Sequence, residues 1–376
     1  GGRKKSSTTE HLLTLMMYMK RLEKEQGGGI CQFMDIKTCF DKMTLSDSLY
    51  ECAQAGVVGK PLRTVKAITN NLTIKIQGDP NTSRCKELSN CLGQGTVYAP
   101  TGTGVTMAST LETNMAKKEA EKVFEDENFT LTPISGPICL APLLVVDDMN
   151  KTCMKAEESS VMGTAITETL DELKMEAHPE KSGLLVFGRN RNKLKEEVLK
   201  TPTIIQGFEM GFKDTETYLG MQFSTLGSND SIMKTLEARR LKCNIKAMEL
   251  RRKLEDDRVQ GIGWLATAIT VFNAVIVSTL TYGCGAWVNM LKKHSEHIEQ
   301  TQRQCLFTVL AISNRSNYRN ILSTCKIMPA LDVIKKMKIC FVNQMIHMKK
   351  QGICYDTLTA EHNKGELKTL IDEVSE

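Results

Sequence analysis

The first part of the chain mixes two hydrophobic patterns. Residues 10–26 carry apolar side chains at helical spacing and end at three consecutive glycines, so they predict a helix. Short apolar runs bounded by turn residues predict strands, and longer runs with a helical period predict further helices. Strands are predicted at residues 30–36, 182–188 and 215–224, and helices at residues 109–126 and 163–176.

The pattern changes after about residue 230, where almost every periodic stretch is helical. Residues 232–257 form a long, strongly basic helical stretch, and the helical pattern continues toward residue 376. We therefore predict two parts, a mixed α and β part at residues 1–225 and a helical part at residues 226–376.

One apolar segment resembles a membrane span. Residues 263–287 contain no charged side chain. The segment also contains Asn273, several threonines and three glycines, and no second segment of this kind accompanies it. We expect a buried helix and turn in a large core rather than a membrane helix.

Composition limits the class of protein without defining a function. The chain of 376 residues is 41% hydrophobic and has a formal net charge of +5, which permits a polyanionic partner without requiring one. Its 13 cysteines form no C-x-x-C pair, so no zinc pattern is visible and we expect reduced cysteines. The chain starts at Gly1 without a signal-peptide pattern. We expect an intracellular protein, nuclear or cytoplasmic, cut from a longer chain.

Three aspartates lie where apolar runs end. Asp147 and Asp148 follow the apolar residues 143–146, and Asp35 lies near the end of "ICQFMDI". Adjacent carboxylates repel each other unless a cation lies between them. Mg²⁺ prefers oxygen ligands, and two such ions about 3.5–4 Å apart can stabilise the attacking and the leaving oxygen of phosphoryl transfer. The alternative, preferred for Asp147 alone, is that each aspartate starts a turn or caps a helix.

The order of further motifs gives these aspartates a context. Seven stretches resemble, in the same order, motifs of the reverse transcriptases of non-LTR (LINE-like) retrotransposons, and the resemblance covers nearly the whole chain. Each motif is loose, but the order of all seven is specific. The stretches are "GGRKKSSTTEHL", "FMDIKTCFDKM", "LGQGTVYAP", "LLVVDDMN", "LKMEAHPEKSGLLVFG", "TYLGMQF" and "VSTLTYGCGAW".

The resemblance implies a two-metal catalytic site. Asp35, Asp147 and Asp148 would be the catalytic and metal-binding carboxylates, and they would hold two Mg²⁺ ions, with Mn²⁺ as a substitute. Lys181 would be catalytic as well, as a cation or proton donor that faces the triphosphate and its leaving pyrophosphate. The alternative for Lys181 is a solvated lysine ahead of a strand.

Five further residues gain a role from the resemblance. Phe40 would bind the nucleotide by packing under the incoming sugar and excluding a 2′-hydroxyl, unless it only packs in the core. Gln94 and Gly95 would lie beside the nascent base pair, where glycine permits close backbone approach. Leu219 and Gly220 would shape the turn that holds the primer end, the primer grip.

Two other polar clusters have competing interpretations. His294 and His297 have H-x-x-H spacing, but with no third ligand nearby an exposed polar turn is preferred to a zinc site. The basic helical stretch either follows a phosphate backbone or forms an ordinary solvated face. Its basic residues include Arg239, Arg240, Lys242, Lys246, Arg251, Arg252 and Lys253.

We predict an α/β (α+β) right-hand polymerase palm with partial fingers up to about residue 225, followed by an α-helical thumb or connection region. The predicted activity is that of an RNA-directed DNA polymerase with an RNA template, a DNA primer and dNTPs as partners. Neither a membrane nor a small-molecule cofactor is expected. The chain begins after the upstream fingers segment of the resembled family, so we expect an N-terminally truncated copy.

Three alternatives stay open at the level of sequence. The first is a catalytically inactive, retrotransposon-derived protein that still binds nucleic acid. The second is an RNA-templated RNA polymerase, against which Phe40 argues. The third is a helical scaffold in which the aspartate pair is incidental.

Overall fold

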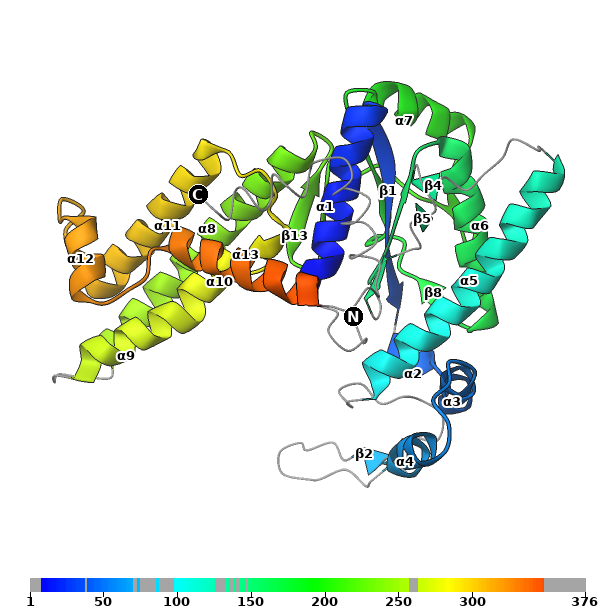
Figure 1. The fold of residues 1–376 in the computed structure, drawn as a ribbon, viewed down its shortest axis with the longest axis horizontal. Helices are drawn as coiled ribbons and strands as arrows, with labels where there is room; N and C mark the ends of the chain where they lie inside the picture. The colour runs from blue at the N-terminus through cyan, green and yellow to red at the C-terminus, as the bar shows by residue number, and fades with distance from the viewer. Residues whose placement is uncertain are drawn as a thin grey trace. The chain divides into compact units, whose positions relative to one another are not determined.

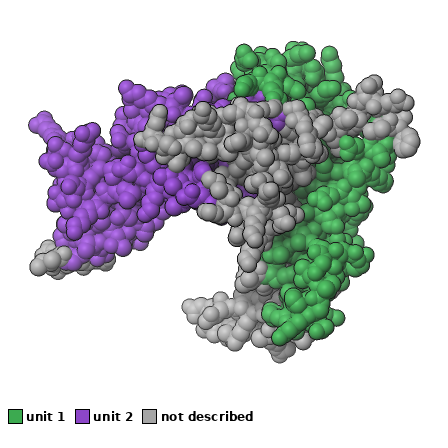
Figure 2. Space-filling view, in the orientation of Figure 1, with its two compact units in different colours: residues 1–8, 22–214 green, residues 9–21, 215–376 purple. Residues whose placement is uncertain are grey.

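The structure is a computed structural model of the chain (Figure 1). It divides into two compact units, which Figure 2 shows in different colours: unit 1 comprises residues 1–8 and 22–214, and unit 2 comprises residues 9–21 and 215–376. The described residues form a mixed α and β structure, as predicted. They are residues 8–37, 39–69, 73–74, 86–87, 98–125, 133–134, 138–139, 143–145, 148–256 and 263–347.

Unit 1 contains a central sheet and the helices that pack on it. The first helix, α1 (Thr8–Glu25), runs from unit 2 into unit 1. The other helices of unit 1 are α2 (Cys39–Lys42), α3 (Leu45–Gln54), α4 (Lys60–Thr69), α5 (Ala99–Glu125), α6 (Ala156–Glu172) and α7 (Arg191–Lys200). Its strands are β1 (Gly28–Lys37), β2 (Thr73–Ile74), β3 (Lys86–Glu87), β4 (Pro133–Ile134), β5 (Ile138–Cys139), β6 (Leu143–Val145), β7 (Asp148–Cys153), β8 (Glu176–Ala177), β9 (Gly183–Gly188), β10 (Ile204–Ile205) and β11 (Phe208–Glu209).

Strand β1 lies at the centre of the main sheet, which is antiparallel throughout (Figure 1). On one edge β1 pairs with β7, which in turn forms a hairpin with β6. On the other edge β9 pairs with residues 28–33 of β1, and β8 pairs with its last two residues. Because β1 is buried on both faces over most of its length, its sequence is nearly continuously apolar rather than strictly alternating.

The core of unit 1 joins β1 to α5 and α6, which pack against each other. Several polar side chains are buried in this region, and one of them is Gln32 of β1, which is 2% exposed. Its Nε2 donates to the carbonyl oxygen of Ser159 at 2.7 Å and to Ser159 Oγ at 2.6 Å. Because a buried amide without partners is costly, these bonds fix α6 to the strand that carries Asp35.

The described residues of unit 2 form a helical assembly with one hairpin. The hairpin consists of β12 (Thr215–Tyr218) and β13 (Met221–Ser224), and it packs on α8 (Ser228–Asp256). The prediction of one strand over residues 215–224 is therefore wrong, because the chain reverses in the middle of that run. The remaining elements are α9 (Gly263–Val271), a π-helix η1 (Phe272–Val277), α10 (Ser278–Thr281), a 3-10 helix η2 (Cys284–Ala286), α11 (Lys292–Leu310), α12 (Tyr318–Thr324) and α13 (Ala330–His347).

The apolar segment 263–287 is only partly buried, which corrects the expectation of a buried helix. From Phe272 onward several of its side chains are in the core, and Phe272, Leu280 and Trp287 are 0% exposed. Its first turn, residues 263–267, is exposed or half-buried, and Leu265 is 38% exposed. Among the described residues, one helical run, Gly263–Ala286, is long and apolar enough to span a membrane by length and composition alone.

The division into units differs from the predicted boundary near residue 225. The hairpin β12–β13 belongs to unit 2 because it packs on α8. Residues 9–21 of α1 also belong to unit 2, where Leu12 lies beside Gly283 and Thr9 beside Gly285. The names palm, fingers and thumb for these parts stay predictions.

Candidate active site

The two described aspartates of the predicted site lie opposite each other in the sheet. In the β1–β7 register Asp35 faces Asp148, and in the β6–β7 hairpin Val145 faces Asp148. Directly opposite residues of an antiparallel pair point to the same side, with Cβ atoms about 4.5–5.5 Å apart. Residues 146 and 147 connect β6 to β7, so Asp147 lies outside the described residues. The sheet therefore brings Asp35 and Asp148 together from distant parts of the sequence.

The register that aligns these carboxylates is held from both edges of β1. On the edge opposite β7, the backbone N–H of Asp35 donates to Ser182 Oγ at 3.3 Å. The carbonyl oxygen of Asp35 accepts from the N–H of His178 at 2.8 Å. A slip of one residue would turn Asp35 to the other face of the sheet. The turn at residues 178–182 thus helps to fix the direction of the Asp35 side chain.

The same turn carries Lys181, the predicted catalytic cation. Lys181 Nζ lies 3.1 Å from Asp35 Oδ2, and the side chains of the two residues are 61% and 22% exposed. An ion pair of this exposure contributes only about 0.2–1 kcal/mol to stability. Lys181 is therefore in direct contact with the carboxylate of Asp35. This ion pair is weak, so another anion can replace Asp35 as the partner of Lys181.

A second lysine, Lys213, lies against the same turn, and it was missed at the level of sequence. Its Nζ donates to the carbonyl oxygen of Lys181 at 2.6 Å. Its side chain crosses Gly183, where an added Cβ would lie 2.7 Å from Lys213 Cε. Backbone bonds between Leu184 and residues 211 and 213 bring the two segments together. No local sequence motif predicts the contact between Lys213 and Lys181. The contact forms because residues 211–213 lie beside β9, which the sequence near either lysine does not indicate.

The donor chemistry of the site fits a hard divalent cation. Asp35 and Asp148 supply carboxylate oxygens, which Mg²⁺ and Mn²⁺ accept. Among the residues that the structure describes, no group of three or more histidine, cysteine, aspartate or glutamate side chains could hold a metal ion. The third predicted ligand, Asp147, is outside that set, so the described part supplies two of the three proposed carboxylates.

The predicted nucleotide-binding residues are only partly within the described structure. Phe40 lies in α2, is partly buried and packs against the core of unit 1. This contact favours the core-packing interpretation of Phe40 and leaves its role at the sugar a prediction. Gln94 and Gly95 lie outside the described residues.

The predicted primer-grip residues form the turn of the β12–β13 hairpin in unit 2. Tyr218 pairs with Met221, so Leu219 and Gly220 are the two residues of the turn. Their φ values are +48° and +76°, which a two-residue turn with both central residues in the left-handed region requires. A Cβ at Gly220 would lie 3.1 Å from Cε1 of Tyr282, so glycine also permits close packing there.

The basic stretch of α8 is not one solvated face. Arg239 is 5% exposed and therefore does not follow a phosphate backbone at the surface. Three more side chains bond to neighbours within unit 2, Arg240 to Gln304 Oε1, Lys246 to Thr279 Oγ1 and Arg251 to Glu255. The residues that remain exposed are Lys242, Arg252 and Lys253.

The two histidines at the start of α11 are buried or half-buried, which corrects the expectation of an exposed turn. His294 is 0% exposed, and its Nδ1 accepts from the backbone N–H of Leu291 at 3.2 Å. Burial lowers the pKa of His294 and the pKa of His297, so the neutral form is favoured at both positions. Within the described part of the chain, no further histidine, cysteine, aspartate or glutamate forms a group with them that could hold a metal ion.

No family model and no curated protein sequence matches this chain. Among solved structures, the chain is similar to telomerase from Candida albicans, in a complex with the TWJ fragment of telomeric RNA. The match has a TM-score of 0.45 and 9% sequence identity, and it covers 86% of this chain and 55% of that chain. The chain thus spans about half the length of the telomerase chain. A likeness this distant carries no conclusion about function.

Proposed function

We propose that this chain carries the active site of an RNA-directed DNA polymerase, a reverse transcriptase of the kind that non-LTR retrotransposons encode. The observation that carries the proposal is the position of Asp35 opposite Asp148, with Lys181 Nζ 3.1 Å from Asp35 Oδ2. Paired carboxylates and a cation at one end of a sheet are groups that nucleotidyl transfer uses. The seven ordered motifs of the sequence support the reverse-transcriptase class in particular.

The proposed reaction adds one nucleotide to a DNA primer. The primer 3′-hydroxyl loses its proton to water, its oxygen forms a bond to the α-phosphorus of a dNTP, and the bond from that phosphorus to the pyrophosphate oxygen breaks. Bound Mg²⁺ would supply charge neutralisation at the attacking and the leaving oxygen. Asp35 and Asp148, which lie at the ends of paired strands, would hold it with carboxylate oxygens together with Asp147.

Lys181 has a separate proposed part in this reaction. Its ammonium group lies beside Asp35 on an exposed turn, so it can exchange that carboxylate for the more highly charged triphosphate. There it would neutralise the leaving pyrophosphate or donate a proton to it. Lys213 supports this part, because it bonds to the carbonyl oxygen of Lys181 and so restrains the turn.

One observation favours a second candidate, a nucleic-acid-binding protein without polymerase activity. The ion pair with Lys181 already occupies one carboxylate oxygen of Asp35. A site that keeps this pair in the presence of nucleotide would have fewer oxygens for a metal ion. Such a protein would bind RNA and incorporate no nucleotide.

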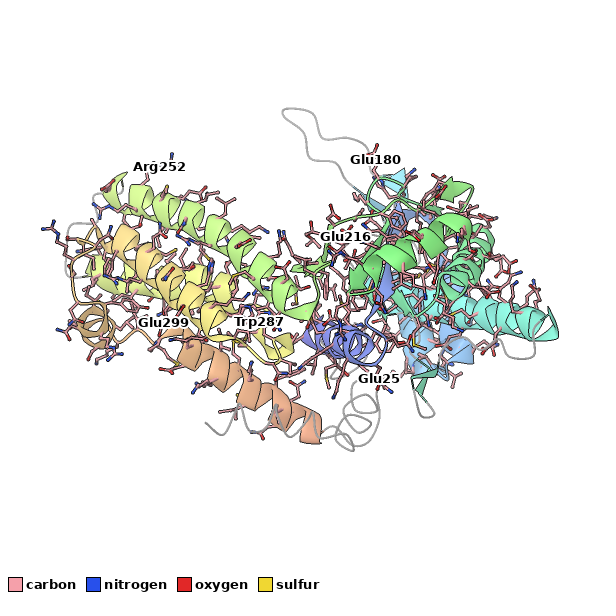
Figure 3. The ribbon with its side chains drawn as sticks, turned by 90° about the horizontal axis from the view of Figure 1, so that it is seen from above. Glu25, Glu180, Glu216, Arg252, Trp287 and Glu299 are labelled. Carbon is pink, nitrogen blue, oxygen red and sulfur yellow. The ribbon has the colours of Figure 1, made fainter. Side chains whose placement is uncertain are left out.

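Primer extension on an RNA template with Mg²⁺ and dNTPs tests the proposal. Asp35→Asn and Asp148→Asn keep the side-chain size and remove the charge, and each is expected to lower the rate at least about 10²-fold to 10³-fold. Glu180→Gln is the matched control, because Glu180 is an exposed carboxylate next to Lys181 (Figure 3). The control is expected to extend the primer at the rate of the unaltered protein.

Three results would redirect the proposal. Extension that survives Asp148→Asn unchanged contradicts the assigned site. Extension with NTPs in place of dNTPs identifies an RNA-templated RNA polymerase. RNA binding by the unaltered protein without any extension, even with an added upstream fingers segment, identifies the inactive binding protein.

A further inference from the structure

Three side chains on one face of α8, spaced four residues apart, bond to alternate positions of β13 and its turn. Four residues advance about 6 Å along a helix, and two residues advance about 6.8 Å along an antiparallel strand, so the two spacings nearly match. We call the three contacts the α8 ladder. The N–H of Ser224 donates to Ser231 Oγ at 2.9 Å, the N–H of Gln222 donates to Thr235 Oγ1 at 2.9 Å, and Arg239 Nη2 donates to the carbonyl oxygen of Gly220 at 3.2 Å.

The last contact of the α8 ladder is made by a buried guanidinium. Arg239 is 5% exposed, and Arg239 Cζ lies 5.0 Å from the ring centroid of Trp287 and 5.7 Å from that of Tyr282. Trp287 is itself 0% exposed and is labelled in Figure 3. Arg239 Nη1 also donates to the carbonyl oxygen of Leu280 at 3.4 Å. Aromatic faces and backbone carbonyls therefore surround the charge.

This cation has no carboxylate partner among the described residues. Its hydrogen bonds go to two carbonyl oxygens, and the groups that raise its pKa are Cys284, Tyr282 and Cys243. Burial outweighs them and lowers the pKa of Arg239 to about 10, so the group is still charged at neutral pH. A buried cation without a counter-ion costs free energy that an apolar side chain of similar size would not cost. Arg239 thus lowers the stability of the folded state, and in return it makes a fixed hydrogen bond to the carbonyl oxygen of Gly220 in the turn.

The turn that Arg239 contacts is the part of the hairpin that most needs restraint. Leu219 and Gly220 both have positive φ, and a leucine in that region is strained. The lower contacts of the α8 ladder hold the strand at Ser224 and Gln222, but neither reaches the turn residues. Arg239 is the side chain that ties Gly220 to the helical segment around Leu280.

We propose that Arg239 is a positioning residue that locks the Leu219–Gly220 turn in the geometry that holds the 3′ end of a DNA primer. The inference rests on the proposed function and on the role at the primer end that the resemblance implies for Leu219 and Gly220. The residue acts through the backbone of Gly220 and not by contact with the reacting atoms. Its loss should therefore weaken the hold on the primer end and spare the binding of the incoming nucleotide.

Steady-state kinetics of Arg239→Met separates these effects. The KM for a recessed primer–template end is expected to rise about tenfold, the change in equilibrium expected for losing one charge-assisted hydrogen bond, while the KM for dNTP stays unchanged. Arg239→Lys keeps a cation that can donate to Gly220 and is expected to restore part of the loss. A general loss of structure would raise both KM values and would not be rescued by lysine.

The matched control is Arg303→Met. Arg303 also lies over an aromatic ring, with its Cζ 5.2 Å from the Phe307 centroid, and its Nη2 donates to a backbone carbonyl, that of Asn314, at 2.8 Å. The variant removes the same charge from unit 2 without touching the hairpin. Its KM for the primer end is expected to match that of the unaltered protein. A rise equal to that of Arg239→Met would assign the effect to net charge and overturn the proposal.

Two readouts keep the proposal testable apart from activity. The dissociation constant of a primer–template duplex labelled at the recessed 3′ end is expected to rise about tenfold in Arg239→Met even if the unaltered protein extends nothing. Replacing Trp264 with phenylalanine leaves Trp287 as the only tryptophan of the chain. In that background, the fluorescence emission of Trp287 with Arg239 and with Arg239→Met reports the loss of the guanidinium from the Trp287 ring. Altered Trp287 emission with unchanged primer binding overturns the proposal, whether or not the protein is a polymerase.

A milder variant covers the case in which Arg239→Met does not fold. Thr235→Val removes only the hydroxyl of the middle contact, which accepts from the N–H of Gln222. Primer binding is expected to weaken in the same direction, by about twofold to fivefold, with the KM for dNTP unchanged. Primer binding that stays at the original strength in a folded Thr235→Val protein contradicts a role of the α8 ladder.

Discussion

At the scale of single residues, the contact between Gly183 and Lys213 predicts a coupling in stability. A Cβ at Gly183 would lie 2.7 Å from Cε and 3.0 Å from Cγ of Lys213, so Gly183→Ala must displace that side chain. We expect it to lower the free energy of unfolding by about 1 kcal/mol and to cost almost nothing in a Lys213→Ala background. Urea denaturation of the four proteins measures the coupling. Equal costs in both backgrounds would disprove the contact.

The two histidines of α11 predict a dependence of stability on pH. Burial first, and then the neighbouring cations Lys293 and Arg240, lower the pKa of His294 and of His297 below the ordinary value of 6.5. Below that value the unfolded chain takes up protons that the folded chain resists, so the free energy of unfolding falls as the pH drops. Above it both states are neutral, and these groups have no effect.

Urea denaturation from about pH 8 to about pH 5 checks this. A protein with both His294→Gln and His297→Gln is expected to lose less stability over the acidic part of this range than the unaltered protein. The same acid-dependent loss in both proteins would mean that other groups cause it.

At the scale of elements, the β12–β13 hairpin carries its strain in two turn residues. Leu219→Gly relieves a left-handed leucine but adds freedom to the unfolded chain, so it is expected to change the free energy of unfolding by less than about 0.5 kcal/mol. Gly220→Ala is expected to cost about 1–2 kcal/mol, because it adds a Cβ at φ +76° that would lie 3.1 Å from Tyr282 Cε1. Chemical denaturation distinguishes the two, and a Leu219→Gly cost as large as that of Gly220→Ala would mean that the leucine side chain itself packs the turn.

The hairpin also shows where prediction from sequence ends. Its two strands lie within the run 215–224 that was predicted as one strand, because Leu219–Gly220 lacks the Asn-Gly or Asp-Gly signal of a tight turn. Strands β1 and β9 were predicted better, since each lies within two residues of its expected bounds, whereas α6 begins at Ala156 instead of residue 163. Repeating patterns identify such elements, whereas the turn at Leu219–Gly220 was expected only from the resemblance, because a leucine does not signal left-handed backbone angles.

At the scale of the whole molecule, pairings between distant segments could not be read from the sequence alone. The resemblance placed Asp35 and Asp148 in one site, but only the β1–β7 register puts them opposite each other. Lys213 was missed because it reaches Lys181 through the course of residues 211–213 beside β9. Arg239 was expected at the surface, because a basic helix pattern does not show which arginine lies under a hairpin.

The position of α1 leads to a prediction about the folding of unit 2, because most of this N-terminal helix belongs to that unit. Residues 9–21 belong to unit 2 although the rest of that unit begins at residue 215. Leu12 is 0% exposed and lies beside Gly283, and Thr9 lies beside Gly285. A fragment of residues 215–347 therefore lacks a helix that fills its core, and exposing that apolar surface should leave the fragment unstable.

We expect a synthetic peptide of residues 8–25 to stabilise that fragment in trans. A ligand that binds only the folded state raises stability with its concentration, by about 2.7 kcal/mol at a hundredfold excess over its dissociation constant. The melting temperature of the fragment, followed by circular dichroism, should therefore rise with added peptide. A peptide with Leu12→Asp is the control, since a charge cannot be buried beside Gly283 without cost. A fragment that melts at the same temperature with either peptide would mean that unit 2 folds without α1.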